Sequence, residues 1–289
     1  MHNLLVIMAG GLSSRMKRAA EDDSVLADDA AQADKMDKGM IGVGSSGRPL
    51  MDYLLYNARA AGYTRVIIIT GTRSVEMREQ YGQKEKDNPF HGLSISYAIQ
   101  SIPPDRVKPL GTADAIYQAM VRYPELKEKA FTCCNSDNLY SARALKLLRR
   151  TEAPHAWINY DRDGLEFSAE KIRGFALTLV DPKGYLMGVV EKPEEADIPN
   201  YVDASGVLRV SMNIFKLTGA QATPFIRDCP LSKERNEKEL PGAILSLAKK
   251  YPKSVLGIPL KEHVPDLTEK ADIARVRDYL QQNFGEIKW

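Results

Sequence analysis

Glycines and a cation follow the first apolar run of this chain. Residues 4–9 are apolar, Gly10 and Gly11 come directly after them, and Arg15 follows four positions later. An apolar run that ends in glycine is typical of a buried parallel strand leading into a tight loop. Bare backbone N–H groups followed by a cation suit a bound phosphate. We therefore expect phosphate chemistry here, and a strand-to-helix turn without a ligand is the alternative.

Residues that could recognise a base follow a later run. Gln100 comes after residues 93–98, and its amide offers both a donor and an acceptor to the edge of a nucleobase. Gly111 and Thr112 stand further along, where a glycine lets backbone groups reach the same base. A surface glutamine and a helix-capping threonine are the simpler interpretation of this motif taken alone.

Two carboxylates could hold a divalent cation. Asp137 follows the apolar run 130–134, and such a position suits Mg²⁺, which takes most of its ligands from water and phosphate. Asp266, after the run 254–259, could complete the site. The alternatives are an Asx-turn or helix cap at Asp137 and a helix cap at Asp266.

The second half of the chain carries a further cation. Glu191 and Lys192 end the run 185–190, and Lys192 could hold a second phosphate as a point charge. An exposed ion pair at a strand end explains the same residues equally well. The four histidines are scattered, so no Ser-His or Cys-His pairing is indicated, and the three cysteines lack the spacing of a zinc site.

These residues need a scaffold that brings strand ends together. Strand-like runs alternate with helical patterns in the first half, which predicts a doubly wound parallel sheet with ligands beyond the carboxyl ends of its strands. The second half has more strand-like runs, a hairpin turn at 181–184 and a closing helix at 271–284. The expected strands are 4–9, 65–70, 93–98, 130–135, 156–160, 173–180, 185–190, 207–215 and 254–259, and the other expected helices are 49–61, 113–121 and 142–150.

Size and composition fit one soluble globular domain. We expect residues 1–289 to form it, with an alternating strand and helix half at 1–150 and a second half at 151–289 that ends in the closing helix. An acidic insertion at about 17–37 could form two short helical pieces or a mobile lid, and we expect it to be solvated and without a chemical role. The net charge of +2 favours neither nucleic acid nor an anionic membrane as a partner, and no signal peptide or membrane span is indicated. A reducing cytoplasm is the expected location.

Two short motifs are set aside. Residues 42–47 satisfy the glycine pattern of a dinucleotide site, but residues 40–41 are too short for the strand that should precede it. Asp161 and Asp163 form the D-x-D pattern that glycosyltransferases use for a metal. We favour a flexible loop for the first and keep the second as a minor alternative.

The order of these motifs resembles the sugar-nucleotide pyrophosphorylases, a family of sugar-phosphate nucleotidyltransferases. The shared order is a strand with Ala-Gly-Gly and an arginine, a lysine, a glutamine, Leu-Gly-Thr-Ala, Ser-Asp-Asn, Glu-Lys-Pro and a late aspartate. The resemblance spans residues 4 to about 279. It implies a three-layer α/β/α fold with a mostly parallel, Rossmann-like central sheet. It also implies a nucleotide-binding half at 1–150 and a sugar-phosphate-binding half at 151–289.

The resemblance also implies roles for individual residues. Catalytic roles fall to Arg15, Lys38 and Lys192, and metal binding falls to Asp137 and, less closely matched, Asp266. Lys35 competes with Lys38, because the family's Pro-Lys is here Asp37-Lys38 after the insertion. Nucleotide contacts fall to Ala9, Gly10, Gly11, Gln100, Gly111 and Thr112, and contacts with the sugar phosphate to Gly174, Glu191, Lys192 and Asn213.

The implied activity is Mg²⁺-dependent condensation of a nucleoside triphosphate with a sugar 1-phosphate, giving a nucleotide sugar and pyrophosphate. The alternatives are a nucleotidyltransferase for another phosphate, such as phosphocholine, and a catalytically silent binding module on the same fold. The sequence leaves open the base, the sugar and whether the chain forms a homo-oligomer.

Overall fold

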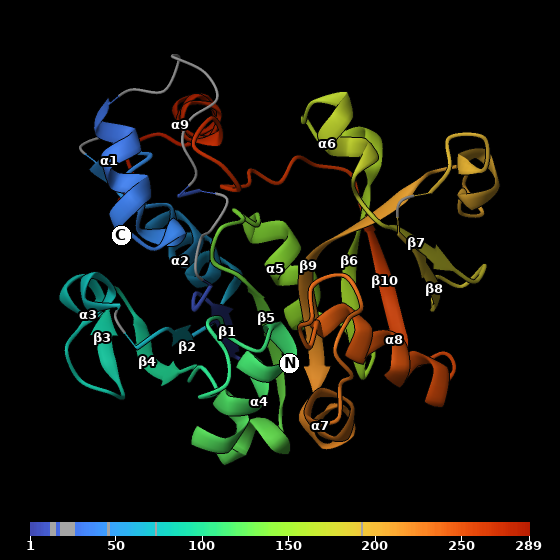
Figure 1. The fold of residues 1–289 in the computed structure, drawn as a ribbon, viewed down its shortest axis with the longest axis horizontal. Coiled ribbons are helices and arrows are strands. Elements are labelled where there is room, and N and C mark those ends of the chain that lie inside the picture. The colour runs from blue at the N-terminus through green and yellow to red at the C-terminus, as the bar shows by residue number, and fades with distance from the viewer. Residues whose placement is uncertain (12–15, 18–26, 45–46, 73, 192) are drawn as a thin grey trace. The chain divides into compact units, whose positions relative to one another are not determined.

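The computed structural model describes residues 1–11, 16–17, 27–44, 47–72, 74–191 and 193–289 (Figure 1). Its contacts divide these residues into two compact units, each assembled from segments that are distant along the chain. Unit 1 contains residues 1–2, 110–133 and 146–264. Unit 2 contains residues 3–109, 134–145 and 265–289. Strand β5 (Ala130–Asn135) and helix α5 (Ala142–Arg150) each run through a boundary between these segments.

Parallel strands form the centre of unit 2. β1 (Leu4–Met8) pairs with β2 (Arg65–Thr70), and β2 pairs with β4 (Leu93–Ile99), both in parallel register. The short β3 (Asn88–Phe90) joins β4 in antiparallel fashion. Every residue of β1 is buried, as expected for a strand covered on both faces.

Unit 2 also contains helices, most of which connect these strands. They are α1 (Ala27–Lys35), the 3₁₀ turn η1 (Lys38–Met40), α2 (Leu50–Ala61), α3 (Val75–Tyr81) and α9 (Asp272–Asn283). Helix α2 begins after Pro49 and ends at Gly62, whose φ of 93° gives the left-handed cap that glycine adopts without strain.

Helix α1 packs beside α9 (Figure 1). Arg277 donates two hydrogen bonds to the carboxylate of Asp29, at 2.7 and 3.2 Å, and Lys270 lies 2.8 Å from Asp34. Asp29 is only 5% exposed. The described end of the acidic insertion is therefore held by ion pairs within unit 2. This differs from the expectation of a solvated segment.

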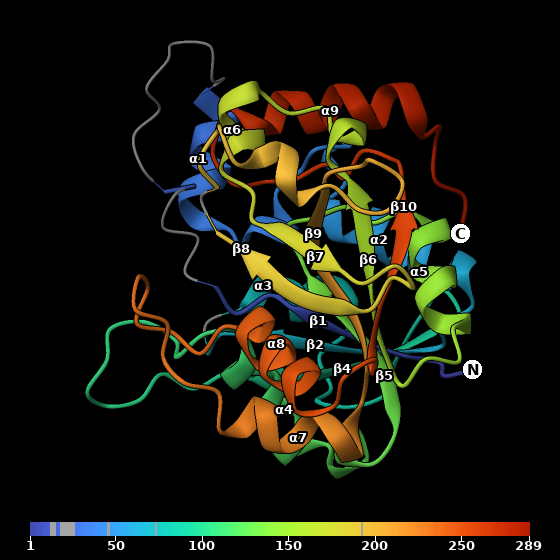
Figure 2. The same cartoon turned by 90° about the vertical axis from the view of Figure 1, so that its right-hand side faces the viewer.

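Unit 1 contains a mixed sheet (Figure 2). β6 (His155–Asp161) lies between β10 (Val255–Leu260), its parallel partner, and β9 (Arg209–Thr218), its antiparallel partner. β7 (Leu177–Val180) and β8 (Leu186–Val190) form a hairpin, and β7 also pairs with β9. The helices are α4 (Thr112–Arg122), α6 (Ala169–Arg173), α7 (Gly219–Arg227) and α8 (Leu240–Lys250), with 3₁₀ turns η3 (Pro124–Lys127), η4 (Arg162–Gly164) and η5 (Ile198–Tyr201).

The expected elements recur within a few residues, and the α/β fold class with parallel central strands is confirmed. One expected strand is too long. Residues 173–180 were expected to be extended throughout, but Arg173 ends helix α6 and Gly174 caps it in the right-handed helical region. Helices α3, α7 and α8 and strand β3 were not expected.

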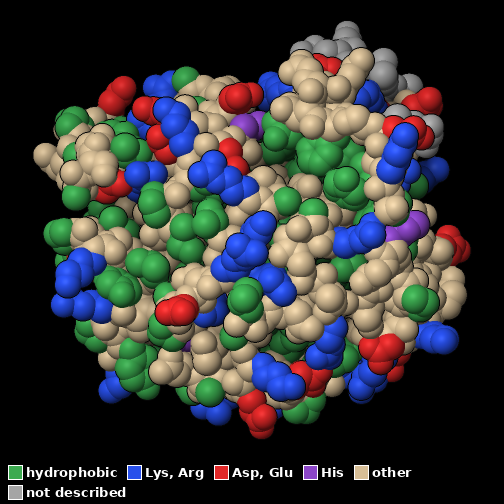
Figure 3. Space-filling model, turned by 180° about the vertical axis from the view of Figure 1, so that it is seen from behind, with side chains coloured by type: hydrophobic (Ala, Val, Ile, Leu, Met, Phe, Trp, Pro, Cys, Tyr) green, Lys and Arg blue, Asp and Glu red, His purple; other side chains and the backbone are tan. Residues whose placement is uncertain are grey.

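Both secondary motifs have structural roles. A Cβ at Gly44 would lie 2.1 Å from the hydroxyl of Tyr53, so packing alone requires a glycine in the 42–47 loop. Asp161 accepts a hydrogen bond from the Asp163 backbone N–H and caps η4. No helix among the described residues is long and apolar enough to cross a membrane. Basic, acidic and apolar side chains are interspersed on the face shown in Figure 3.

Candidate functional site

The glycine loop of unit 2 lies against Gln100. A Cβ added to Gly10 would lie 3.3 Å from the Gln100 Oε1 atom and 3.4 Å from the Thr70 carbonyl carbon. The Gln100 backbone N–H donates to the Thr70 carbonyl at 2.8 Å, and Ala9 N–H donates to the Ile69 carbonyl at 2.7 Å. The structure thus places together two residues that the sequence assigns to nucleotide binding. Gly11 follows them and is exposed.

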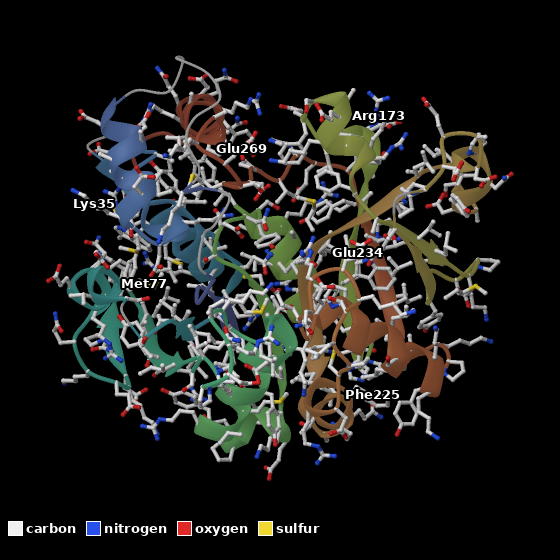
Figure 4. The ribbon with its side chains drawn as sticks, in the orientation of Figure 1. Lys35, Met77, Arg173, Phe225, Glu234 and Glu269 are labelled. Carbon is white, nitrogen blue, oxygen red and sulfur yellow. The ribbon has the colours of Figure 1, made fainter. Side chains whose placement is uncertain are left out.

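Lys38 forms an ion pair with Asp137. The Lys38 Nζ atom lies 2.9 Å from Asp137 Oδ2, and these side chains are only 11% and 24% exposed. Lys38 begins η1, and Asp137 follows the end of β5. The adjacent Ser136 N–H donates to the Met8 carbonyl at 3.1 Å, which ties this segment to the end of β1. Lys35, labelled in Figure 4, is exposed at the end of α1, so the structure favours Lys38 for a role at this carboxylate.

Asp266 lies beside Asp137 on a neighbouring extended segment. Asn138 and Asp266 form an antiparallel bridge, and Leu267 N–H donates to the Asp137 carbonyl at 2.8 Å. Burial raises the pKa of the Asp137 carboxyl, the negative charge of Asp266 raises it further, and the ammonium of Lys38 opposes the rise. The ammonium of Lys38 and the carboxylate of Asp266 therefore act on the Asp137 carboxyl in opposite directions.

Neither carboxylate caps a helix. Helix α9 begins after Ala271 and no side chain caps it, while its first residue, Asp272, accepts hydrogen bonds from the backbone N–H groups at 268 and 269, at 2.8 and 2.9 Å. Asp266 accepts a hydrogen bond from the Thr268 hydroxyl. Ser141 accepts from a backbone N–H in the first turn of α5. The helix-cap alternatives for Asp137 and Asp266 are therefore not seen, and the Asx-turn at Asp137 stays an alternative.

The backbone around Lys38 is fixed on both sides. Asp37 adopts φ −64° and ψ 144°, and its Oδ2 atom accepts a 2.7 Å hydrogen bond from the Ser74 hydroxyl. Burial raises the pKa of Asp37, and the bond from Ser74 opposes that rise. A Cβ at Gly39 would lie 3.2 Å from the Ser136 carbonyl oxygen. Sequence reasoning missed Ser74, whose only signal is its place just after the end of β2.

The charges of this site fit a divalent cation. Among the described residues no group of three or more His, Cys, Asp or Glu side chains is placed to hold a metal. Mg²⁺ needs less, because it binds through one or two carboxylates and takes its other ligands from water and phosphate. Asp137 and Asp266 are such a pair, and Lys38 is paired with the first of them.

In unit 1, packing accounts for the residue types at Gly111 and Thr112. Gly111 has φ 117°, and a Cβ there would lie 2.5 Å from the Lys238 carbonyl oxygen, so the close approach of that backbone requires a glycine. The Thr112 hydroxyl accepts a 2.9 Å hydrogen bond from Leu240 N–H at the start of α8. Thr112 is the first residue of α4 rather than its cap. Contacts of both residues with a nucleotide stay predictions.

Asn213 occupies a strained position in unit 1. The register of β6 and β9 shifts by two extra residues around it, and its φ is 57°. Left-handed conformations of residues other than glycine, and bulges, often occur at functional sites. This geometry is consistent with the expected role of Asn213 near a sugar. Glu191 and Gly174 are exposed, and their expected roles stay predictions.

Two of the expected catalytic cations, Arg15 and Lys192, lie outside the described residues.

Comparisons with known proteins identify the family of this chain. Residues 33–225 match the sequence profile of the nucleotidyl transferase family. A D-glycero-alpha-D-manno-heptose 1-phosphate guanylyltransferase from Aneurinibacillus thermoaerophilus is 26% identical over half of this chain and half of its own length. A glucose-1-phosphate adenylyltransferase from Koribacter versatilis is 23% identical over 73% of this chain and 47% of its own. The chain spans about half the length of these relatives.

A solved structure supports the fold. The structure of a UDP-glucose pyrophosphorylase complexed with UDP-glucose superimposes with a TM-score of 0.68 at 17% identity, covering 98% of this chain and 99% of that one. The mixed α/β fold with a mostly parallel sheet is shared with this protein. Motif order, the family profile over two thirds of the chain and the fold agree: the chain belongs to the nucleotidyl transferase family.

Proposed function

We propose that this protein transfers a nucleotidyl group from a nucleoside triphosphate to a sugar 1-phosphate and releases pyrophosphate. The observation that carries the proposal is the group formed by Lys38, Asp137 and Asp266 in unit 2. A cation and two carboxylates suit a metal–triphosphate complex. Gly10 and Gln100, side by side in the same unit, offer backbone and amide groups to the nucleotide.

The relatives favour a sugar phosphate as the acceptor. Two of them are named for heptose 1-phosphate and glucose 1-phosphate, and the structural neighbour was solved with UDP-glucose. Their names cover guanine, adenine and uracil, so they do not select the base. Phosphocholine and a silent binding module have no comparable support, and the assay below tests both.

The reaction needs no general base. An oxygen of the sugar 1-phosphate attacks the α-phosphorus, the bond from that phosphorus to the bridging oxygen of the β-phosphate breaks, and pyrophosphate leaves. The second pKa of a phosphate monoester is about 6, so the nucleophile is already ionised at neutral pH. Catalysis then depends on positioning and on neutralising charge.

The chain's residues divide this work. Asp137 and Asp266 would hold Mg²⁺, which supplies Lewis-acid stabilisation of negative charge on the phosphates. Lys38 and Arg15 balance charge on the leaving pyrophosphate, and Lys192 holds the attacking phosphate. By analogy with cationic side chains in phosphoryl transfer, loss of Arg15 should lower the rate on the order of 10³-fold.

Pyrophosphate release tests the proposal. Each of the four common nucleoside triphosphates is combined with a panel of sugar 1-phosphates and with phosphocholine, in Mg²⁺. We expect release with at least one sugar 1-phosphate. Release only with phosphocholine would reject the sugar acceptor, and nucleotide binding without any release would indicate a silent module. Lys192→Ala should raise the KM for the sugar phosphate far more than that for the nucleotide, and equal effects would reject its role.

A further inference from the structure

In the structure, the ammonium of Lys38 is paired with the carboxylate of Asp137, which would be a ligand of the metal. Its Nζ atom is 2.9 Å from Asp137 Oδ2, within hydrogen-bond distance, and the lysine side chain is only 11% exposed. This contact is a partly buried ion pair between residues 99 positions apart. A divalent cation bound through Asp137 and the ammonium of Lys38 would repel one another at this distance.

Charge makes the exchange possible. A divalent cation at Asp137 would bring one more positive charge than the ammonium of Lys38 does, and the carboxylate of Asp266 acts on the same carboxyl group. The exchange would also free the ammonium of Lys38, and the triphosphate offers it a new anionic partner.

We infer that Lys38 is an exchangeable internal cation, which neutralises Asp137 in the nucleotide-free protein and is displaced from it by the divalent metal. The inference rests on the proposed function, which places a metal at Asp137. It goes further by assigning Lys38 two successive partners, the carboxylate first and the phosphates second.

The local backbone allows this exchange by side-chain rotation alone. Asp37 is held by Ser74, Met40 N–H donates to the Asp37 carbonyl at 2.8 Å, and Gly39 is in close contact with Ser136. The lysine ammonium sits on a flexible four-carbon stem with rotatable bonds. The ammonium can therefore leave Asp137 while the Lys38 Cα stays in place.

Metal binding without nucleotide tests the inference directly. Free Mn²⁺ is followed by electron paramagnetic resonance during titration of the nucleotide-free full-length protein, its Lys38→Met variant and its Lys35→Met variant. We expect Lys38→Met to bind Mn²⁺ at least tenfold more tightly than the parent. Lys35→Met removes a nearby exposed lysine and should match the parent. A Lys38→Met variant that binds no more tightly than Lys35→Met would overturn the inference.

A second measurement uses only the parental protein, so it does not depend on the folding of a variant. Lysines are labelled with an amine-reactive reagent and each site is quantified by mass spectrometry, with and without saturating Mn²⁺. We expect Lys38 labelling to rise several-fold with Mn²⁺ and Lys35 labelling to stay constant. Unchanged Lys38 labelling at a metal concentration that fills the site, or the absence of any filled site, would overturn the inference.

These tests fail separately from the proposed function. They use no nucleotide and no sugar phosphate, so a negative result leaves pyrophosphate release to be judged in its own assay. Conversely, absence of pyrophosphate release with every substrate would reject nucleotidyl transfer while leaving the measured competition between Lys38 and Mn²⁺ in place.

Discussion

Removing the Ser74 hydroxyl should loosen the backbone that carries Lys38. Ser74 Oγ donates to Asp37 Oδ2 at 2.7 Å, and Asp37 directly precedes Lys38. Hydrogen bonds to charged groups contribute about 1.5–3 kcal/mol. We therefore expect Ser74→Ala to lower the free energy of unfolding by about 2 kcal/mol at neutral pH, because the Asp37 carboxylate stays half-buried without its donor.

The loss should depend on pH with a defined sign. Burial raises the pKa of Asp37, and the Ser74 bond opposes that rise, so Ser74→Ala should raise this pKa further. A raised carboxyl pKa makes the folded state bind its proton more tightly, so the charged form is the costly one. The stability gap between parent and variant should be largest above the variant's folded pKa and should shrink as pH falls through it.

Activity provides the functional half of the test. We expect Ser74→Ala to lower kcat/KM for pyrophosphate release about tenfold, which corresponds to a loss of about 1.4 kcal/mol of transition-state stabilisation, because the Lys38 ammonium is positioned less precisely. The matched control is Ser94→Ala, which removes an exposed 2.9 Å hydrogen bond to Asp87 in the same unit. Unfolding is measured in urea by circular dichroism. If Ser74→Ala behaves like Ser94→Ala in both assays, the positioning role assigned to Ser74 is wrong.

Two further predictions concern stability in unit 1. Gly111→Ala should lower the free energy of unfolding in urea by at least about 3 kcal/mol, because its Cβ would meet the Lys238 backbone at a positive φ. As the control, Gly242→Ala should raise the free energy of unfolding by about 0.5–1 kcal/mol, because Gly242 is exposed in a helix and has open space at its Cβ position. Equal effects of the two substitutions would contradict this prediction. His155 is fully buried beside Gln221, and burial lowers its pKa to about 4. Its contribution to the free energy of unfolding should therefore be intact above pH 6.5 and should fall by about 3 kcal/mol as the pH drops from 6.5 toward 4. An imidazole proton resonance of His155 that titrates near pH 6.5 would refute this prediction.

Local pattern predicted most of the scaffold. The β-branched run 65–70 forms β2 with the expected bounds, and the pattern ending at Gly62 forms α2. Helices α7 and α8 were missed because Pro224 lies inside the first and Pro241 in the first turn of the second. Residues 173–176 were misassigned because an apolar run does not reveal that Gly174 caps the preceding helix.

Pairings between distant residues needed the fold. The aspartate at 137 and the lysine at 38 were both expected at the site, but no sequence pattern shows that they form an ion pair. The hydrogen bond between Ser74 and Asp37 could not be predicted for the same reason, since it joins a loop at a strand end to the end of the insertion. For Gly111, the sequence indicated that a glycine is needed for a close backbone approach. It could not show that the approaching backbone is that of Lys238, far along the chain.

The most direct test of nucleotidyl transfer at Asp137 is pyrophosphate release by two matched variants, Asp137→Asn and Asp163→Asn. Both remove one carboxylate charge and keep the side-chain size. Asp163 belongs to the D-x-D motif and is exposed. We predict that Asp137→Asn lowers the rate on the order of 10³-fold in Mg²⁺, by analogy with other groups that neutralise phosphoryl charge. Asp163→Asn should retain the parental rate. Parental activity in Asp137→Asn, or its loss in Asp163→Asn alone, would contradict the proposed site.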